Sequence, residues 1–124
     1  MIEESYVCFD TAKMLKEAGF DEPCSFCYSP CKDIRRKNYK RNSDLVKGFY
    51  SRPTQALAAR WLREVHHYAV CVWYSAEHEK WFYAHGNLDN MMFDEEYSIS
   101  DFIYDSYEQS LEAGLQEAIK LIKK

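Results

Sequence analysis

The stretch SYEQSLEAGLQEAIKLIK, residues 106–123, carries the strongest structural signal in the chain. Ser106 and Gln109 have the spacing of a capping box, in which side chains satisfy the free amides at a helix N-terminus. Acidic residues come early in the stretch and lysines late, which suits the helix dipole. The apolar residues recur at helical spacing and form one stripe: Leu111, Leu115, Ala118, Ile119 and Ile122. These features predict a helix over 106–123.

The residues before this helix predict a further helix and three strands. A proline that suits a first helical turn precedes apolar residues at helical spacing, so we predict a helix over 53–66. The run Tyr68–Tyr74 is apolar on both faces of the pleat, as in a central strand. Two more strands are predicted at Trp81–His85 and Tyr97–Tyr104. A meander of these strands would carry both long helices on one face.

The N-terminal part of the chain is less regular. Asp10 can cap a short helix over 11–18, and Cys24–Ser29 predicts a short strand. Apolar residues are sparse in 31–52, which therefore predicts a long basic loop. The whole chain, 1–124, is predicted to be a single α+β domain. We expect a three- to four-stranded, mainly antiparallel sheet with helices packed mainly on one face.

Composition places the chain among globular proteins. Its 124 residues are 47% hydrophobic and 16% aromatic, enough to bury a core without disulfides. The longest apolar run, Tyr68–Tyr74, is far shorter than the roughly 20 residues of a membrane span. The acidic first residues lack the pattern of a signal peptide. We therefore expect a cytoplasmic protein with no membrane partner.

Charge is distributed unevenly along the chain, although the formal net charge is only −4. Residues 1–31 carry two lysines against six acids, residues 32–63 carry ten Lys and Arg against two acids, and residues 64–124 carry four lysines against twelve acids. A basic segment between two acidic ones can dock on the protein's own acidic surface or bind an external polyanion. The pattern leaves both interpretations open.

The basic segment also contains aromatic residues. Cations that contact phosphates, together with rings that stack on bases, are the minimal requirement for binding single-stranded nucleic acid. The candidate nucleic-acid-binding residues are Arg35, Arg36, Lys37, Tyr39, Lys40 and Arg41. The twelve acids after residue 63 would repel a polyanion outside a narrow patch. The alternative is therefore a solvated or self-docking loop.

Three of the five cysteines suggest a metal site. Cys24, Cys27 and Cys31 have the spacing of one zinc knuckle. The sequence has no second paired knuckle, so the alternative places Cys24 in the core and leaves the other two as loop thiols. We therefore expect no cofactor, with zinc as the alternative. No residue pattern predicts a catalytic site.

Three stretches carry a family resemblance: TAKMLKEAGFDEPC (11–24), PTQALAARWLREVH (53–66) and SYEQSLEAGLQEAIKLI (106–122). In residues and in order they resemble a group of short, uncharacterised proteins from phages and prophages of gut Bacteroidota. The group has no established activity. The resemblance therefore implies a phage-type accessory protein in a bacterial cell, and it assigns no catalytic residue.

These observations together predict a non-enzymatic accessory or binding protein that contacts another protein or a second copy of itself. Exposed aromatic residues such as Trp81 and Tyr83 are the candidate contacts. One alternative is a nucleic-acid-binding module that uses residues 32–52. The other is a small zinc protein that uses the three cysteines named above.

Overall fold

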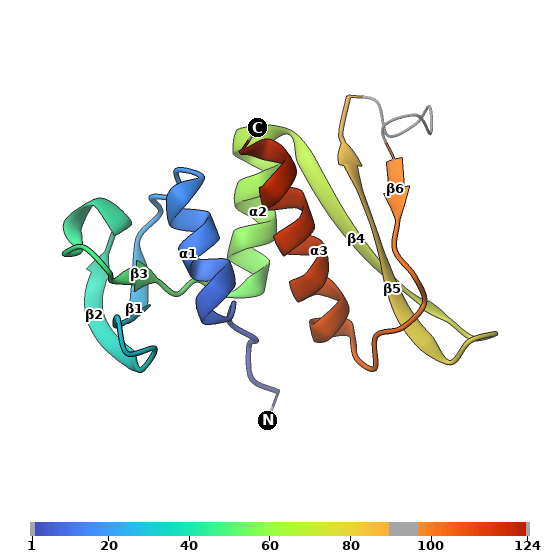
Figure 1. Cartoon of the computed structure of the whole chain (residues 1–124), viewed down its shortest axis with the longest axis horizontal. Coiled ribbons are helices and arrows are strands. Elements are labelled where there is room, and N and C mark those ends of the chain that lie inside the picture. Colours follow the sequence, from blue (N-terminus) through green and yellow to red (C-terminus); the bar gives the residue numbers. More distant parts are fainter. Residues whose placement is uncertain (1, 90–96, 124) are drawn as a thin grey trace.

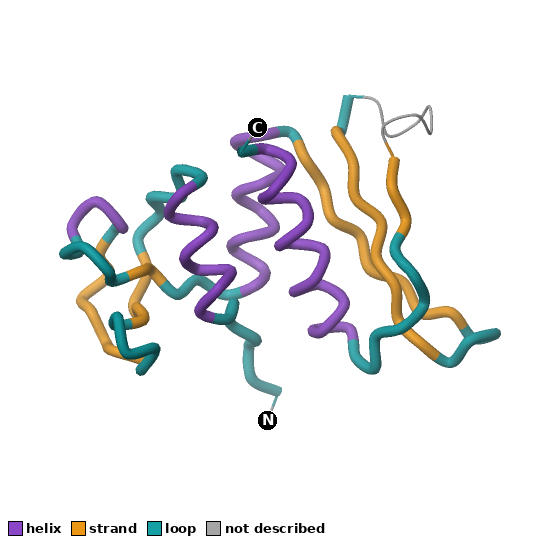
Figure 2. The backbone as a smooth tube through the Cα atoms, viewed as in Figure 1, coloured by secondary structure: helices purple, strands orange, loops and turns teal. Residues whose placement is uncertain are grey.

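The computed structural model describes residues 2–89 and 97–123. Within these ranges, three helices lie between two three-stranded antiparallel sheets, so the elements form layers along the long axis of the molecule (Figure 1). The backbone trace in Figure 2 shows the same arrangement. The predicted α+β class is confirmed. One sheet more than predicted is present, because the strand near Cys24 does not join the meander.

The C-terminal sheet is the predicted meander. β4 (Tyr68–Ser75) pairs with β5 (Lys80–Asn87) along its whole length, and β5 pairs with β6 (Tyr97–Ile99). The first two predicted strands are present, but the prediction of a central strand at Tyr68–Tyr74 is wrong, because β4 lies at the edge of the order β4-β5-β6. The third strand is shorter than predicted. Beyond its end, the hydroxyl of Ser100 accepts a hydrogen bond from the amide of Tyr83 at 2.9 Å. A side chain thus replaces the backbone acceptor that would continue the ladder.

The N-terminal sheet corrects the prediction of a long basic loop at 31–52. Two strands from this segment, β2 (Ile34–Lys40) and β3 (Tyr50–Ser51), pair antiparallel with β1 (Cys24–Tyr28) in the order β2-β1-β3. A short 3₁₀ helix, Asn42–Asp44, lies between them. β2 is an edge strand with six of its seven residues exposed. It therefore lacks the alternation of apolar and polar residues from which a strand is predicted.

The two long helices lie where the sequence predicts, except that the first of them begins two residues late, so Pro53 precedes the cap and is not in the first turn. α2 (Gln55–His66) and α3 (Tyr107–Ile122) each start with a residue whose side chain accepts from the helix backbone. The hydroxyl of Ser106 accepts from the amide of Gln109 at 3.1 Å, and Thr54 caps α2 in the same way. Of the helices in the described ranges, none has the length and apolar composition needed to cross a bilayer.

The first helix, α1 (Phe9–Glu17), is capped from another element. It starts earlier than predicted, so Asp10 lies inside the first turn and is not the N-cap residue. The N-cap residue is Cys8, whose amide donates to Oε2 of Glu112 on α3 at 3.0 Å. The hydroxyl of Thr11 donates to the same oxygen. A carboxylate at a helix N-terminus is favourable, and here it also joins two helices.

One hydrophobic core connects the layers. Its buried members come from α1, the residues on either side of α1, β1, α2 and α3, and include Leu15, Phe20, Tyr28, Leu62, Leu115 and Ile119. On the other side of this core, α3 packs closely against the C-terminal sheet. A Cβ atom on Gly114 would lie 2.5 Å from Cγ1 of Val70 and 3.1 Å from the ring of Tyr83. Glycine at this position therefore allows the close approach of helix and sheet.

Candidate functional site

The basic strand β2 and the C-terminal sheet lie at opposite ends of the molecule. The N-terminal sheet, which contains β2, forms one end, and the C-terminal sheet forms the other, with the helices between them (Figure 1). Within the described ranges, no ion pair joins a side chain of 32–52 to a side chain of 64–89 or 97–123. The docking contacts of this segment are instead with the acidic N-terminal segment, where the amide and the hydroxyl of Ser43 donate to the carboxylate of Asp21 at 2.8 Å and 3.0 Å.

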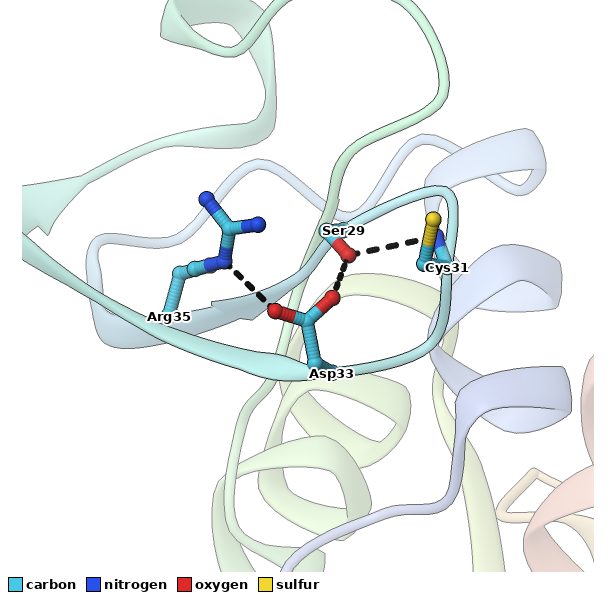
Figure 3. A network of polar contacts seen from close by, with 4 residues as sticks. All are labelled: Ser29, Cys31, Asp33 and Arg35. Carbon is cyan, nitrogen blue, oxygen red and sulfur yellow. Dashed lines mark hydrogen bonds and ion pairs between the residues drawn. The ribbon is translucent and has the colours of Figure 1, made fainter.

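The turn that leads into β2 engages Arg35 (Figure 3). One carboxylate oxygen of Asp33 accepts a hydrogen bond from Nε of Arg35 at 2.7 Å, and the other accepts one from the hydroxyl of Ser29. The hydroxyl oxygen of Ser29 also accepts a hydrogen bond from the backbone amide of Cys31 at 3.2 Å. The hydrogen bonds from Ser29 and Arg35 lower the pKa of Asp33. Arg41, just beyond β2, is held by a backbone carbonyl 3.0 Å away. Arg35 and Arg41, both predicted nucleic-acid-binding residues, therefore stabilise the two ends of β2.

The cations along β2 itself are directed to solvent and to aromatic rings. The guanidinium of Arg36 lies 5.7 Å from the centre of the Phe26 ring. The ammonium of Lys37 lies 5.7 Å from the centre of the Phe49 ring, and Lys40 is exposed. Cations in such positions are attracted to the negative face of the ring. β2 thus carries three predicted cations between its middle and its C-terminal end.

A bulge places Tyr39 at the solvent edge of the sheet. Cys24 pairs with Lys40 and Phe26 pairs with Arg36, so three residues of β2 stand opposite one residue of β1. Tyr39 has a left-handed backbone, with φ of 53°, and its side chain is 69% exposed. Bulges at sheet edges bend the strand and change the direction of a side chain. Tyr39 thus lies within the bulge, with its side chain largely exposed.

A groove of about 320 Å³ beside β1 brings together side chains that are distant in sequence. The residues that characterise it, called the aromatic groove below, are Tyr6, Phe26, Tyr39 and Arg52. The Arg52 guanidinium lies 4.0 Å from the centre of the Tyr6 ring. The rings of Tyr6 and Phe26 meet edge to face, with centres 5.9 Å apart. Among the predicted nucleic-acid-binding residues, only Tyr39 lines this groove; Cys24, a predicted zinc ligand, lines it too.

The three candidate zinc ligands occupy different environments. Cys24 belongs to the hydrophobic core, Cys27 is buried on β1, and Cys31 is exposed in the turn. Burial, with a contribution from the Glu22 carboxylate, raises the pKa of Cys24 to about 11, and burial also raises the pKa of Cys27. Zinc binds thiolates, which these environments disfavour. Within the described ranges, no group of three or more His, Cys, Asp or Glu side chains is placed to hold a metal ion.

The aromatic residues predicted to make protein contacts are largely covered. Tyr83 is buried beneath α3, and Trp81 is partly buried against the ring of Tyr107, with ring centres 5.8 Å apart. The opposite face of the C-terminal sheet, which none of the three helices covers, carries the exposed residues (Figure 1). We call this surface the open sheet face. It comprises Trp73, Phe82, Ile99 and Phe102.

The sequence signal for the aromatic groove was weak because its parts come from separate segments. Tyr6 precedes α1, Phe26 lies on β1 and Arg52 follows β3. The high aromatic content indicates that some rings remain at the surface, but it does not say which. Only strand pairing brings these residues together.

Comparison with protein-family models found no match, and comparisons with curated proteins and with solved structures found no significant match.

Proposed function

We propose that this chain is a nucleic-acid-binding module in which Arg36, Lys37 and Lys40 contact phosphate groups. The observation that carries the proposal is the placement of these cations on an exposed edge strand, at the end of the molecule opposite the C-terminal sheet. Lysine and arginine contacts to phosphates supply affinity that is independent of sequence. Charges on an edge strand also oppose pairing with another sheet. The same residues thus keep this edge accessible.

Salt dependence tests the proposal. We expect a fluorescently labelled single-stranded oligonucleotide to bind at about 50 mM salt and to dissociate as salt is raised. Three phosphate contacts predict a slope of log K against log salt of about −2. Substituting Arg36→Gln and Lys40→Gln together should reduce the slope by about 1.4.

The matched control is Lys120→Gln, which removes an exposed charge from α3. It should leave the slope unchanged. Absence of binding at low salt, or an equal slope for the double variant and the wild type, would contradict the proposal.

The open sheet face supports a second function, contact with a protein partner. Phe102 packs on Phe82 with ring centres 4.7 Å apart, and Trp73 is 45% exposed. Exposed acids flank this apolar cluster in the chain: Glu77, Glu79 and Asp101. A partner with apolar side chains surrounded by Lys and Arg therefore complements this face.

A designed peptide with leucines flanked by lysines is a direct probe of this second function. We expect it to change the tryptophan fluorescence of the protein, and we expect Trp73→Ser to reduce its affinity at least about fivefold. Val65→Ser, at an exposed position on α2, is the control. Two results would contradict the choice of a basic partner. One is no peptide binding, and the other is a concentration-dependent dimer that Trp73→Ser abolishes, which would assign the face to a second copy.

A further inference from the structure

We propose that the aromatic groove is a subsite for one unstacked nucleobase, so that the ligand of the β2 surface is single-stranded nucleic acid. This inference rests on the nucleic-acid-binding function proposed above and specifies the strand state of the ligand. A phosphate-binding strand alone does not distinguish single strands from duplexes, because both expose phosphates. A groove that holds a base does distinguish them, because the bases of a duplex remain stacked inside the helix.

The residues of the groove supply flat surfaces and a planar cation. Tyr39 is 69% exposed and, within the described ranges, its ring packs against no other aromatic ring. Its faces are therefore available for stacking. The Arg52 guanidinium covers Tyr6 at 4.0 Å, and Phe26 stands edge-on to Tyr6. Stacking on tyrosine and arginine planes is how proteins hold unpaired bases.

The size of the groove suits a small ligand group. Its volume of about 320 Å³ lies at the lower end of the range for small-molecule pockets, which is about 300–1,000 Å³. Glu4 also lines it. A carboxylate there repels phosphate but accepts hydrogen bonds from the exocyclic amines of adenine, cytosine and guanine. The groove is therefore suited to the base of a nucleotide and unsuited to its phosphate.

The phosphates have a separate path beside the groove. Tyr39 lies between Lys37 and Lys40 in the chain, and Arg36 stands over Phe26, a member of the groove. Cations and ring surfaces are thus interleaved on one strand and its neighbour. A strand of seven residues extends over about 20 Å. A single strand that runs along β2 can therefore place its backbone on the cations while one base enters the groove.

Three probes of equal length test the subsite: a single-stranded oligonucleotide of about 12 nucleotides, the corresponding duplex, and an abasic strand with the same phosphates. We expect the single strand to bind at least about fivefold more tightly than the abasic strand at the same salt, which is the lower value for one stacked base. The duplex should bind like the abasic strand or more weakly.

The variant Tyr39→Asn removes the ring and keeps a residue type that tolerates the left-handed backbone at this position. It should reduce single-strand binding at least about fivefold and leave abasic binding unchanged, whereas Tyr39→Phe should retain single-strand binding. Circular dichroism establishes that each variant folds.

Each outcome has a defined meaning. Equal binding of the single strand and the abasic strand, or unchanged binding by Tyr39→Asn, overturns the base subsite and leaves the phosphate-binding strand intact. Tighter binding of the duplex overturns the assignment to single strands. Failure of all three probes to bind at about 50 mM salt overturns the proposed function itself.

Discussion

The guanidinium of Arg52 lies 4.0 Å from the centre of the Tyr6 ring, and its Nε donates to the hydroxyl of Tyr28 at 3.2 Å. That hydroxyl donates in turn to the backbone oxygen of Val7 at 2.6 Å. One planar cation therefore joins the segment before α1 to β1 and to the residue after β3. The aromatic groove keeps its shape because these contacts fix two of its walls.

We predict that Arg52→Lys lowers the free energy of unfolding by about 1 kcal/mol, because an ammonium keeps the charge but loses the planar stacking surface. Urea denaturation followed by circular dichroism measures this change. Arg63→Lys, at an exposed position on α2, is the control and should change stability little. Equal stability of Arg52→Lys and the wild type would show that stacking on Tyr6 contributes nothing.

The contact of α3 with the C-terminal sheet predicts that Gly114→Ala is destabilising. Alanine in a helix interior normally gains about 1 kcal/mol over glycine. Here its Cβ would lie 2.5 Å from Cγ1 of Val70, so helix and sheet must separate, at a cost of about 1–3 kcal/mol. We therefore expect Gly114→Ala to lower the stability of the folded protein, which thermal unfolding experiments measure. Val70→Ala removes the shortest contact of the added Cβ and leaves the one with the Tyr83 ring, so Gly114→Ala should be less destabilising in that background. An effect of the same size there would contradict this explanation.

A buried histidine predicts a pH dependence of stability. His85 is 5% exposed, and burial lowers its pKa while the Glu117 carboxylate partly offsets that effect. Its Nδ1 lies 2.7 Å from the hydroxyl of Tyr68. Below about pH 6.5 the unfolded chain binds a proton that the folded chain does not. The free energy of unfolding should therefore fall as pH decreases through this range, by at most about 1.4 kcal/mol per pH unit from this residue.

Urea denaturation at pH 7.5 and pH 5.5 measures the slope, and His85→Gln supplies the comparison. The variant should show a smaller loss of stability between the two pH values, because glutamine does not titrate. An equal loss in both proteins would assign the dependence to other groups.

The cysteine environments predict two classes of thiol. Cys8 and Cys31 are exposed and should react rapidly with a chromogenic disulfide reagent in the native protein. Cys24, with its pKa raised to about 11, and the buried Cys27 should react only as the protein unfolds. Rapid modification of either buried thiol would contradict the described packing. Protection of Cys31 by added zinc would restore the metal-site hypothesis.

Local sequence patterns sufficed for the two long helices and for two strands of the C-terminal sheet. The apolar stripe and the Ser106 cap of α3 lie within one segment, as do the two apolar faces of β4. Such patterns report burial on one element at a time. They failed for β2, because an edge strand with exposed cations has no buried face to create a period. They also misplaced the first helix, whose N-terminus receives the carboxylate of Glu112 from a helix about a hundred residues later.

The candidate site was predicted only in part, and for the same reason. The concentration of cations along the chain identified the basic segment, and the aromatic residues among those cations identified Tyr39. It could not show that Arg35 closes a turn with Asp33, since that role depends on the hairpin geometry. It also could not show that Trp73 is exposed while Tyr83 is buried, because both faces of this hairpin are apolar in sequence.

The sequence by itself determined the α+β class, the positions of α2, α3, β4 and β5, and the division into acidic and basic segments. These features depend on periodicity, capping and charge within short stretches of chain. The tertiary structure alone decided that β2 lies at the opposite end of the molecule from the C-terminal sheet and that Tyr6, Phe26, Tyr39 and Arg52 line one groove. Those relations depend on which strands pair and where a bulge falls, and these are set by packing between residues distant in sequence.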